Sequence, residues 1–157
     1  MSKHPVLIPP PVWAVTAGAL QLVLARRRRP TAASIASGTV IGVAAAGIAG
    51  AAVLAFLRAG TTISPEHPHR ASALVTTGPF RWTRNPMYIA LTGLLIAHAA
   101  VRRSWLALAP VAGFVAVIDR VQIPAEEGAL QARFGRAYER YRGSVPRWVG
   151  ARRRRRG

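Results

Sequence analysis

The sequence predicts an all-α protein: a polytopic membrane helical bundle of about four transmembrane helices with a C-terminal amphipathic helix. The chain of 157 residues is 51% hydrophobic, yet it has 22 basic residues against 5 acidic ones. Its arginines stand at the ends of long apolar runs, where membrane helices meet headgroups. A soluble nucleic-acid-binding domain would explain the charge but not the apolar content, so we expect no nucleic-acid partner. The chain has no cysteine, which excludes disulfides and cysteine-based sites.

The first apolar run is Val6–Ala25, which contains Pro9–Pro11 near its start and ends at Arg26–Arg29. Proline is tolerated in a first helical turn, so we expect the helix to begin at these prolines. The charges follow the run and no small-residue cleavage site is present, which argues against a secretory signal peptide. The second run, Pro30–Leu57, has no charged residue and exceeds the ~20 residues that a bilayer-crossing helix needs.

Small residues recur at every fourth position of the second run, at Gly38, Gly42, Ala46 and Gly50. Such a stripe lets another helix backbone approach closely. It can serve an internal helix pair or a homodimer, and a chance spacing in an Ala/Gly-rich helix is the alternative. The sequence leaves the oligomeric state open.

The third and fourth runs are short for membrane spans and are predicted to form a tight helical hairpin. They are Pro86–Val101, closed by Arg102–Arg103, and Ser104–Ile118, closed by Asp119–Arg120. Flanking side chains that snorkel can compensate for the short length. His98 lies inside the third run, where a neutral histidine hydrogen-bonded between helices is favoured over a functional one.

The C-terminal segment carries an amphipathic pattern. Its aromatic and aliphatic residues share one helical face, which predicts a helix on the bilayer surface or packed under the bundle: Leu130, Phe134, Tyr138 and Tyr141. Five consecutive arginines at 152–156 predict a disordered tail against anionic membrane lipid. The chain therefore divides into two N-terminal transmembrane helices (1–57), a core with loop, hairpin and amphipathic helix (58–149), and a basic tail (150–157).

Charge counts predict the orientation. With four spans, both termini and the loop 58–85 share one side, which carries 16 of the basic residues against 6 on the other. The positive-inside rule then places both termini and this loop in the cytoplasm. The cluster Arg26–Arg29 argues for the opposite orientation, because short loops weigh most in that rule.

Two segments carry candidate chemistry. The loop 76–88 contains two X-Pro steps, and Pro86 can open a helix whose free backbone N–H groups bind an anion. An ordinary interfacial belt of aromatic and basic residues explains the loop equally well. The adjacent pair Glu126 and Glu127 follows Pro124 and can recognise a cationic or polyhydroxylated ligand. Alternatively, the pair offsets nearby arginines at a helix start.

A histidine pair, His67 and His69, lies beside Glu66 in the loop 58–85. Two histidines at this spacing without a further ligand cluster are a weak signal, so we expect no metal site.

Five short motifs follow one another between about residues 58 and 149: Thr77-Gly78-Pro79-Phe80-Arg81, Arg84-Asn85-Pro86-Met87-Tyr88, Pro124 with Glu126-Glu127, Phe134-Gly135 with Tyr138 and Tyr141, and Val145 with Arg147-Trp148. In order and spacing, these motifs resemble the integral-membrane methyltransferases, namely the isoprenylcysteine carboxyl methyltransferase and phospholipid N-methyltransferase families. Asparagine at position 85 is common among the phospholipid methyltransferases, whereas the carboxyl methyltransferases usually have histidine there.

The resemblance implies S-adenosylmethionine as methyl donor, bound near the cytosolic membrane surface, and a lipophilic substrate that enters from the membrane. The cofactor-binding residues it implies are Gly78, Pro79, Phe80, Arg81, Asn85, Pro86, Tyr88, Glu126 and Glu127. The catalytic residues it implies are Arg84, Asn85, Tyr88 and Glu127. A non-enzymatic membrane protein that recruits anionic lipid or a partner through its basic tail is the alternative.

Overall fold

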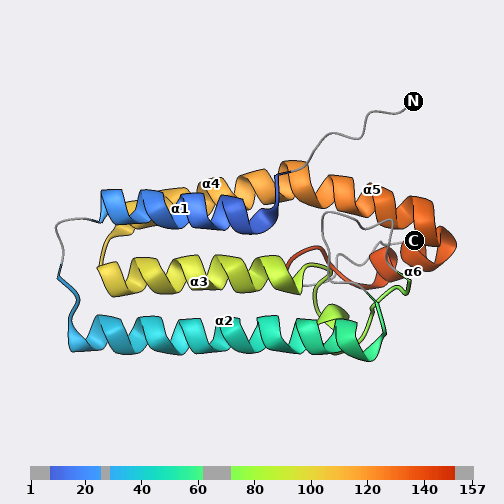
Figure 1. Ribbon diagram of the computed structural model, residues 1–157, viewed down its shortest axis with the longest axis horizontal. Coiled ribbons are helices and arrows are strands. Elements are labelled where there is room, and N and C mark those ends of the chain that lie inside the picture. Colours follow the sequence, from blue (N-terminus) through green and yellow to red (C-terminus); the bar gives the residue numbers. More distant parts are fainter. Residues whose placement is uncertain (1–7, 26–28, 62–71, 151–157) are drawn as a thin grey trace.

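The computed structural model describes residues 8–25, 29–61 and 72–150, and their regular elements are all helical, as predicted. Figure 1 shows α1, α2, α3 and α4 side by side along the long axis, with α3 between α2 and the pair α1 and α4. α5 continues the direction of α4 past the ends of α1 and α3. The elements are α1 (Pro10–Leu24), α2 (Ala32–Arg58), η2 (Gly78–Arg81), α3 (Pro86–Arg102), η3 (Trp105–Ala107), α4 (Leu108–Val117), the π-helical η4 (Ile118–Gln122), α5 (Ile123–Phe134) and α6 (Arg136–Ser144).

Several sequence predictions concern segments outside the described residues. These segments are Lys3, Arg26–Arg28, the group Glu66, His67 and His69, and the arginines 152–156.

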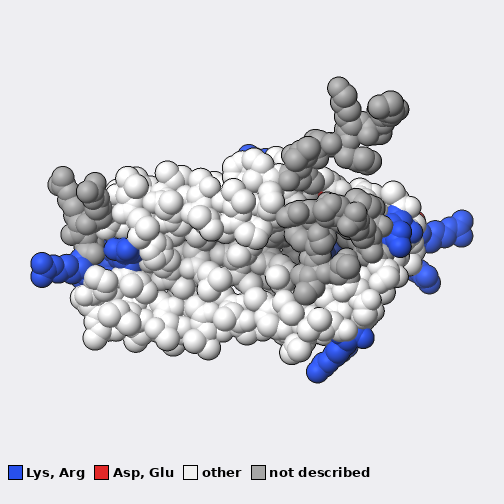
Figure 2. Space-filling view, viewed as in Figure 1, with Lys and Arg blue, Asp and Glu red and all other residues white. Residues whose placement is uncertain are grey.

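Two helical stretches of the described chain are long and apolar enough to cross a membrane, Ala32–Arg58 and the continuous run Trp105–Phe134. α1 and α3 are apolar but shorter, with 15 and 17 residues. Large apolar side chains cover outward helix faces, among them Val15, Val40 and Val43, each about two-thirds exposed or more. A helix that has apolar residues on its outward face as well as on its packed face is typical of a membrane span or of a buried core. In Figure 2, basic side chains gather mainly at the two ends of the molecule, with an uncharged band between them.

The predicted helix starts are confirmed. Pro10 and Pro86 occupy first-turn positions of α1 and α3, where the missing N–H leaves no helical bond unmade. α2 begins with a capping box, in which the Thr31 and Ser34 side chains each accept a hydrogen bond from the other residue's backbone. Arg103, the residue that follows α3, has a left-handed conformation (φ 52°).

The predicted small-residue stripe divides between two faces of α2. Gly38 and Gly42 face α3, whereas Ala46 is exposed and a Cβ on Gly50 would meet nothing within 4 Å. At about 3.6 residues per turn, a step of four residues turns the face by about 40°, so a fourfold spacing drifts off the contact. The buried contact continues instead through Ala45, which lies against Gly93 of α3.

The prediction that the fourth apolar run is closed by Asp119–Arg120 is wrong for the helix. The helix continues through the π turn η4 into α5. Pro124 has no N–H and its ring crowds the carbonyl of residue 120, and the wider π turn lies at this point. The charged pair is therefore inside one long helix rather than in a loop.

The C-terminal amphipathic segment forms two helices instead of one. Gly135, with φ 47° and ψ −122°, separates α5 from α6 in a conformation that favours glycine. The predicted apolar face is nevertheless confirmed, because Leu130, Phe134, Tyr138 and Tyr141 pack in one cluster with residues of α2 and η2.

His98 takes the predicted role of a histidine hydrogen-bonded between helices. Its Nδ1 lies 2.8 Å from Oε1 of Gln21, which is fully buried in α1. The Gln21 amide nitrogen donates to the carbonyls of Leu95 and Ala107, at 2.9 Å each. One polar side chain therefore ties α1 to α3 and to the start of α4.

Candidate functional site

The candidate site lies at the end of the bundle where α3 begins and where α5, α6 and η2 meet (Figure 1). The start of α1 and the end of α2 lie at this end too, in agreement with the predicted topology. Arg102, the last residue of α3, and Arg103, which follows it, lie at the opposite end of this helix. All the sequence-predicted site residues therefore belong to one end of the molecule.

Glu126 connects α5 to α3. The Tyr88 hydroxyl, from the first turns of α3, donates a hydrogen bond to Glu126 Oε1. Gln122 Nε2 donates to the same oxygen from one turn earlier in the chain, at 2.8 Å. Tyr88 and Gln122 are both buried. This arrangement joins the predicted residues Tyr88 and Glu126 through a direct contact.

Glu127 connects α5 to two guanidinium groups. Arg84 Nη1 lies 2.8 Å from Glu127 Oε1, and Arg147 Nη2 lies 2.8 Å from Oε2. The Glu127 side chain is 14% exposed and that of Arg84 is 11% exposed, so the pair is largely removed from water. Arg84 Nη1 also donates to the Tyr138 hydroxyl of α6, at 3.2 Å.

The segment 145–148, which we call the strap, follows α6 and is hydrogen-bonded to the loop before α3. The carbonyl of Arg147 accepts hydrogen bonds from the Thr83 hydroxyl at 2.9 Å and from Asn85 Nδ2 at 3.0 Å. The backbone N–H of Arg84 donates to the carbonyl of Pro146 at 2.9 Å. Asn85 thus orients the strap at the N-cap position of α3.

Asp119 contacts the side chains of two strap residues, Arg147 and Trp148. Its Oδ1 accepts a hydrogen bond from Trp148 Nε1 at 2.7 Å and one from Arg147 Nη1 at 3.2 Å. Sequence reasoning did not select Asp119 or Arg147 as site residues. The available signals were an acidic residue at the end of an apolar run, and the Arg-Trp pair after the last helix.

Other predicted residues have supporting positions around these contacts. Phe80 is buried and packs edge-on against Phe56, with ring centroids 5.2 Å apart, so its ring belongs to the core. Its carbonyl accepts the Tyr141 hydroxyl at 2.8 Å. Pro79 and Pro86 are buried, whereas Gly78 and Arg81 are exposed. Gly78 has φ 58°, which favours glycine at the start of η2.

Electrostatics keep the Arg147 guanidinium charged and the Tyr138 phenol neutral. The hydrogen bond to Glu127 raises the pKa of Arg147 above its usual value, so this guanidinium stays charged. Burial raises the pKa of Tyr138, which remains a neutral phenol beside Arg84. Among the described residues, two buried side-chain polar atoms lack a hydrogen-bond partner, and both are in this region: Arg84 Nε and Gln131 Oε1. The site therefore contains a nitrogen and an oxygen that could form further hydrogen bonds.

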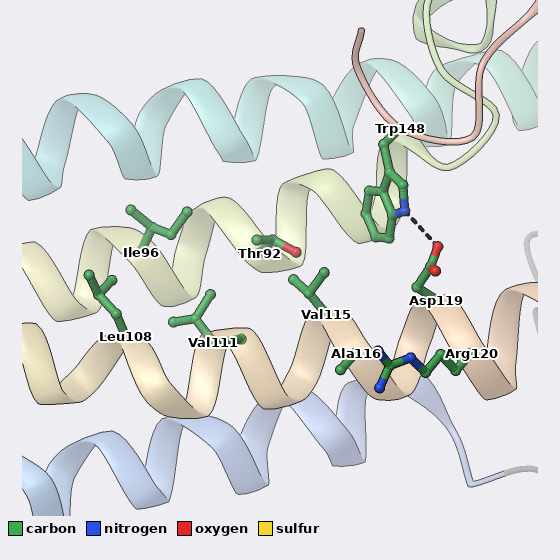
Figure 3. A pocket seen from close by; sticks show the side chains of 10 residues that line it. Thr92, Ile96, Leu108, Val111, Val115, Ala116, Asp119, Arg120 and Trp148 are labelled. Atoms are coloured by element: carbon green, nitrogen blue, oxygen red, sulfur yellow. Dashed lines mark hydrogen bonds between the residues drawn. The ribbon is translucent and has the colours of Figure 1, made fainter.

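An open groove of about 600 Å³ runs between α3 and α4 and ends at the strap (Figure 3). Figure 3 shows aliphatic side chains along its length and Trp148, Asp119 and Arg120 at one end. Its volume is in the range of roughly 300–1,000 Å³ that small-ligand sites occupy. The lining residues are Thr92, Ile96, Leu108, Val111, Ala112, Val115, Ala116, Asp119, Arg120 and Trp148.

Comparisons with known proteins identify the family of the chain. A family model described as phospholipid methyltransferase matches residues 33–137, which include the site residues of η2, α3 and α5. An uncharacterised protein of Haemophilus influenzae is 38% identical over 63 residues, which are 40% of this chain and the whole of that protein. No solved structure matches the chain.

Proposed function

The chain belongs to the phospholipid methyltransferase family, and from this premise we propose that it is a membrane-embedded, S-adenosylmethionine-dependent methyltransferase. Its acceptor is a lipophilic substrate, either the amine of a lipid headgroup or the carboxylate of a lipidated small molecule. The observation that carries the proposal is the meeting of Arg84 and Tyr88 with Glu127 and Glu126 at one end of the bundle.

The residues of this end fit the methyl donor chemically. Carboxylates accept hydrogen bonds from ribose hydroxyls and from an amino group, which suits Glu126 and Glu127. A guanidinium pairs with a carboxylate, which suits Arg84, whose buried Nε has no partner among the described residues. The Tyr88 ring can stabilise a sulfonium through its face. When bound, the donor supplies an electrophilic methyl group on a positively charged sulfur.

The chain's own residues then have three tasks. Arg84, Glu126 and Glu127 bind and orient, because transfer to a nucleophile depends mainly on close in-line approach. The strap 145–148 covers the site and limits the entry of water. The glutamates already have intramolecular partners, so a ligand must share or replace the contacts that Arg147 and Tyr88 make.

The groove between α3 and α4 supports a lipophilic acceptor. It opens to the side of the bundle and is lined mainly by aliphatic residues such as Ile96, Val111 and Val115. A lipid tail that lies there stays in hydrocarbon while the headgroup approaches the strap. We therefore propose that the acceptor enters sideways from the membrane.

We further propose that α1, α2, α3 and the α4–α5 helix all cross the membrane, with the site and both termini in the cytoplasm. The charge-free middle band in Figure 2 and the exposed aliphatic side chains support the crossing. The larger number of basic residues on the side of the site supports the orientation. Snorkelling of Arg102 and Arg103 compensates for the short α3.

A labelled-donor assay tests the proposed activity. Membranes that contain the protein are incubated with methyl-labelled S-adenosylmethionine and total lipid extract, and the labelled product is identified. We expect label in a lipid with the wild type and with Glu139→Gln, which removes an exposed carboxylate of α6, and a strong loss with Glu127→Gln. Labelling that is the same for Glu127→Gln and the wild type contradicts the proposal.

A further inference from the structure

The Arg147 side chain lies between two carboxylates of the α4–α5 helix. Its Nη2 and Nε donate to the Glu127 carboxylate, at 2.8 and 3.2 Å. Its Nη1 donates to Asp119 Oδ1 at 3.2 Å. One guanidinium therefore joins both carboxylates, and because it belongs to the strap, it can leave one of them without a change in the helix.

The acceptor positions of the Glu127 carboxylate are mostly occupied by these cations. Oε1 contacts Arg84 Nη1 at 2.8 Å and Arg147 Nε at 3.2 Å, and Oε2 contacts Arg147 Nη2 at 2.8 Å. A carboxylate offers about four acceptor positions. A ribose that binds Glu127 through both of its hydroxyls needs two of them. At least one of the three existing contacts must therefore break when such a ligand binds.

The contact of Arg147 breaks at a lower cost than that of Arg84. The Arg84 side chain is only 11% exposed, and its separation from Glu127 would leave buried charge unpaired, which is strongly unfavourable. The Arg147 side chain is 31% exposed and already has a second carboxylate partner, Asp119. Arg147 is therefore the residue that a ligand of Glu127 displaces.

Asp119 has the acceptors to hold the displaced guanidinium. Trp148 Nε1 donates to its Oδ1 at 2.7 Å (Figure 3), whereas its Oδ2 accepts no hydrogen bond from the described residues. The Asp119 backbone carbonyl also lies 3.4 Å from Arg147 Nη1. The strap backbone stays in place meanwhile, because the Thr83 and Asn85 side chains donate to the Arg147 carbonyl. The Arg147 side chain can thus move alone.

We propose that Arg147 occupies the Glu127 carboxylate until the methyl donor displaces it, and that Asp119 is a positioning residue that retains the displaced side chain. This inference rests on the proposed methyltransferase function. The donor binds the form in which Arg147 has left Glu127, so the observed donor affinity depends on the population of that form. Asp119 raises this population, and the Arg147–Glu127 contact lowers it.

Donor binding to variants of Arg147 tests the displacement. The full-length protein in lipid nanodiscs is titrated calorimetrically with S-adenosylmethionine. Arg147→Ala should bind the donor about fivefold more tightly than the wild type, because the competing partner of Glu127 is gone. Arg140→Ala is the matched control, since it removes the same charge from an exposed position of α6, and it should bind like the wild type.

A structural role of Arg147 predicts the opposite sign. If Arg147 only maintained the shape of the site, its loss would weaken donor binding. We expect instead that Arg147→Ala binds the donor more tightly although it unfolds at a lower temperature than the wild type without donor. Arg147→Gln, which retains hydrogen-bond donors but no charge, should also bind more tightly, and it serves if Arg147→Ala does not fold. Donor affinity at or below that of the wild type in both variants overturns the displacement.

The role of Asp119 is tested by the dependence of its effect on Arg147. Asp119→Asn should weaken donor binding by about threefold, because Asn accepts from Trp148 but gives Arg147 no charged partner away from Glu127. In the Arg147→Ala background the same substitution should have no effect, since no guanidinium remains to be retained. An equal effect of Asp119→Asn in both backgrounds, or no effect in the wild type, overturns this role.

Failure of this inference is distinguishable from failure of the proposed function. A wild type that binds S-adenosylmethionine, together with an Arg147→Ala variant that binds it no more tightly, contradicts only the displacement. A wild type and an Arg147→Ala variant that are both folded and both fail to bind S-adenosylmethionine contradict the methyltransferase proposal.

Discussion

The Arg147 guanidinium meets the Glu127 carboxylate through two hydrogen bonds, Nη2 to Oε2 at 2.8 Å and Nε to Oε1 at 3.2 Å, across 20 positions of the chain. Arg84 contacts the same carboxylate from the loop before α3. One acidic side chain therefore connects the strap, the long helix and the start of α3. This shared contact positions the strap over the site.

Replacement of Arg147 should loosen the strap. Arg147→Ala loses the contacts with Glu127 and Asp119, and because the arginine side chain is 31% exposed, we expect a cost of only about 1 kcal/mol. That corresponds to a fall in melting temperature of about 3 °C. Arg147→Lys should recover only part of the lost stability, since lysine cannot make both hydrogen bonds to the Glu127 carboxylate. Thermal unfolding in detergent measures this. Arg140→Ala, on exposed α6, is the control, and an equal effect of both alanine variants contradicts the role of the strap.

The close contact between α2 and α3 should depend on Gly38. A Cβ at this position would clash with the Val101 side chain and lie 2.9 Å from the Ala97 carbonyl oxygen. Gly38→Ala should therefore destabilise the bundle by about 1–3 kcal/mol. Gly50→Ala has open space around its Cβ and should be neutral or slightly stabilising, because alanine favours helix. Thermal unfolding of the two variants tests this difference in stability. Similar stabilities would show that the packing does not need glycine at position 38.

The buried amide of Gln21 should be important for the position of α1. Gln21→Leu removes the donor to the Leu95 and Ala107 carbonyls and the partner of His98, and we expect a loss of about 2–3 kcal/mol. Thr16→Val, which removes an exposed side-chain bond on the same helix, should change stability little. Unfolding measurements that give the two variants the same stability contradict this assignment.

The phenol and the ring of Tyr88 should contribute separately to donor binding. Tyr88→Phe removes the hydrogen bond to Glu126 but retains the aromatic face, so a moderate loss of S-adenosylmethionine affinity is expected. Tyr88→Leu removes both, and its affinity should be lower again by about tenfold. Titration calorimetry compares the two. Equal affinities would mean that the ring does not face the sulfonium.

Much of the fold follows from local signals in the sequence. Prolines mark the starts of α1 and α3, since their fixed φ and missing N–H suit a first turn. Apolar length predicts α2, and the spacing of Tyr138 and Tyr141 predicts a shared packed face. The meeting of Tyr88 with the glutamate pair was predicted through family motifs, and the structure places Tyr88 in contact with Glu126, whereas Glu127 contacts Arg84 and Arg147.

Other features depend on three-dimensional context that local patterns do not contain. The π turn at Ile118–Gln122 keeps Asp119 inside a continuous helix, although a charged pair normally suggests a loop. The break at Gly135 separates two helices whose residues still share one face. The strap contacts of Arg147 join residues 20 and 28 positions apart, and sequence spacing cannot indicate such partners.

Direct binding of S-adenosylmethionine to the purified full-length protein tests the central claim, that the loop before α3 and the glutamates of α5 form one methyl-donor site. Titration calorimetry in detergent and in lipid nanodiscs should give saturable one-to-one binding for the wild type and for Glu139→Gln. Glu127→Gln should bind at least about tenfold more weakly, because it removes the charge that Arg84 and Arg147 hold in place. Absence of binding to the wild type in both media, or equal binding by Glu127→Gln, would contradict the account.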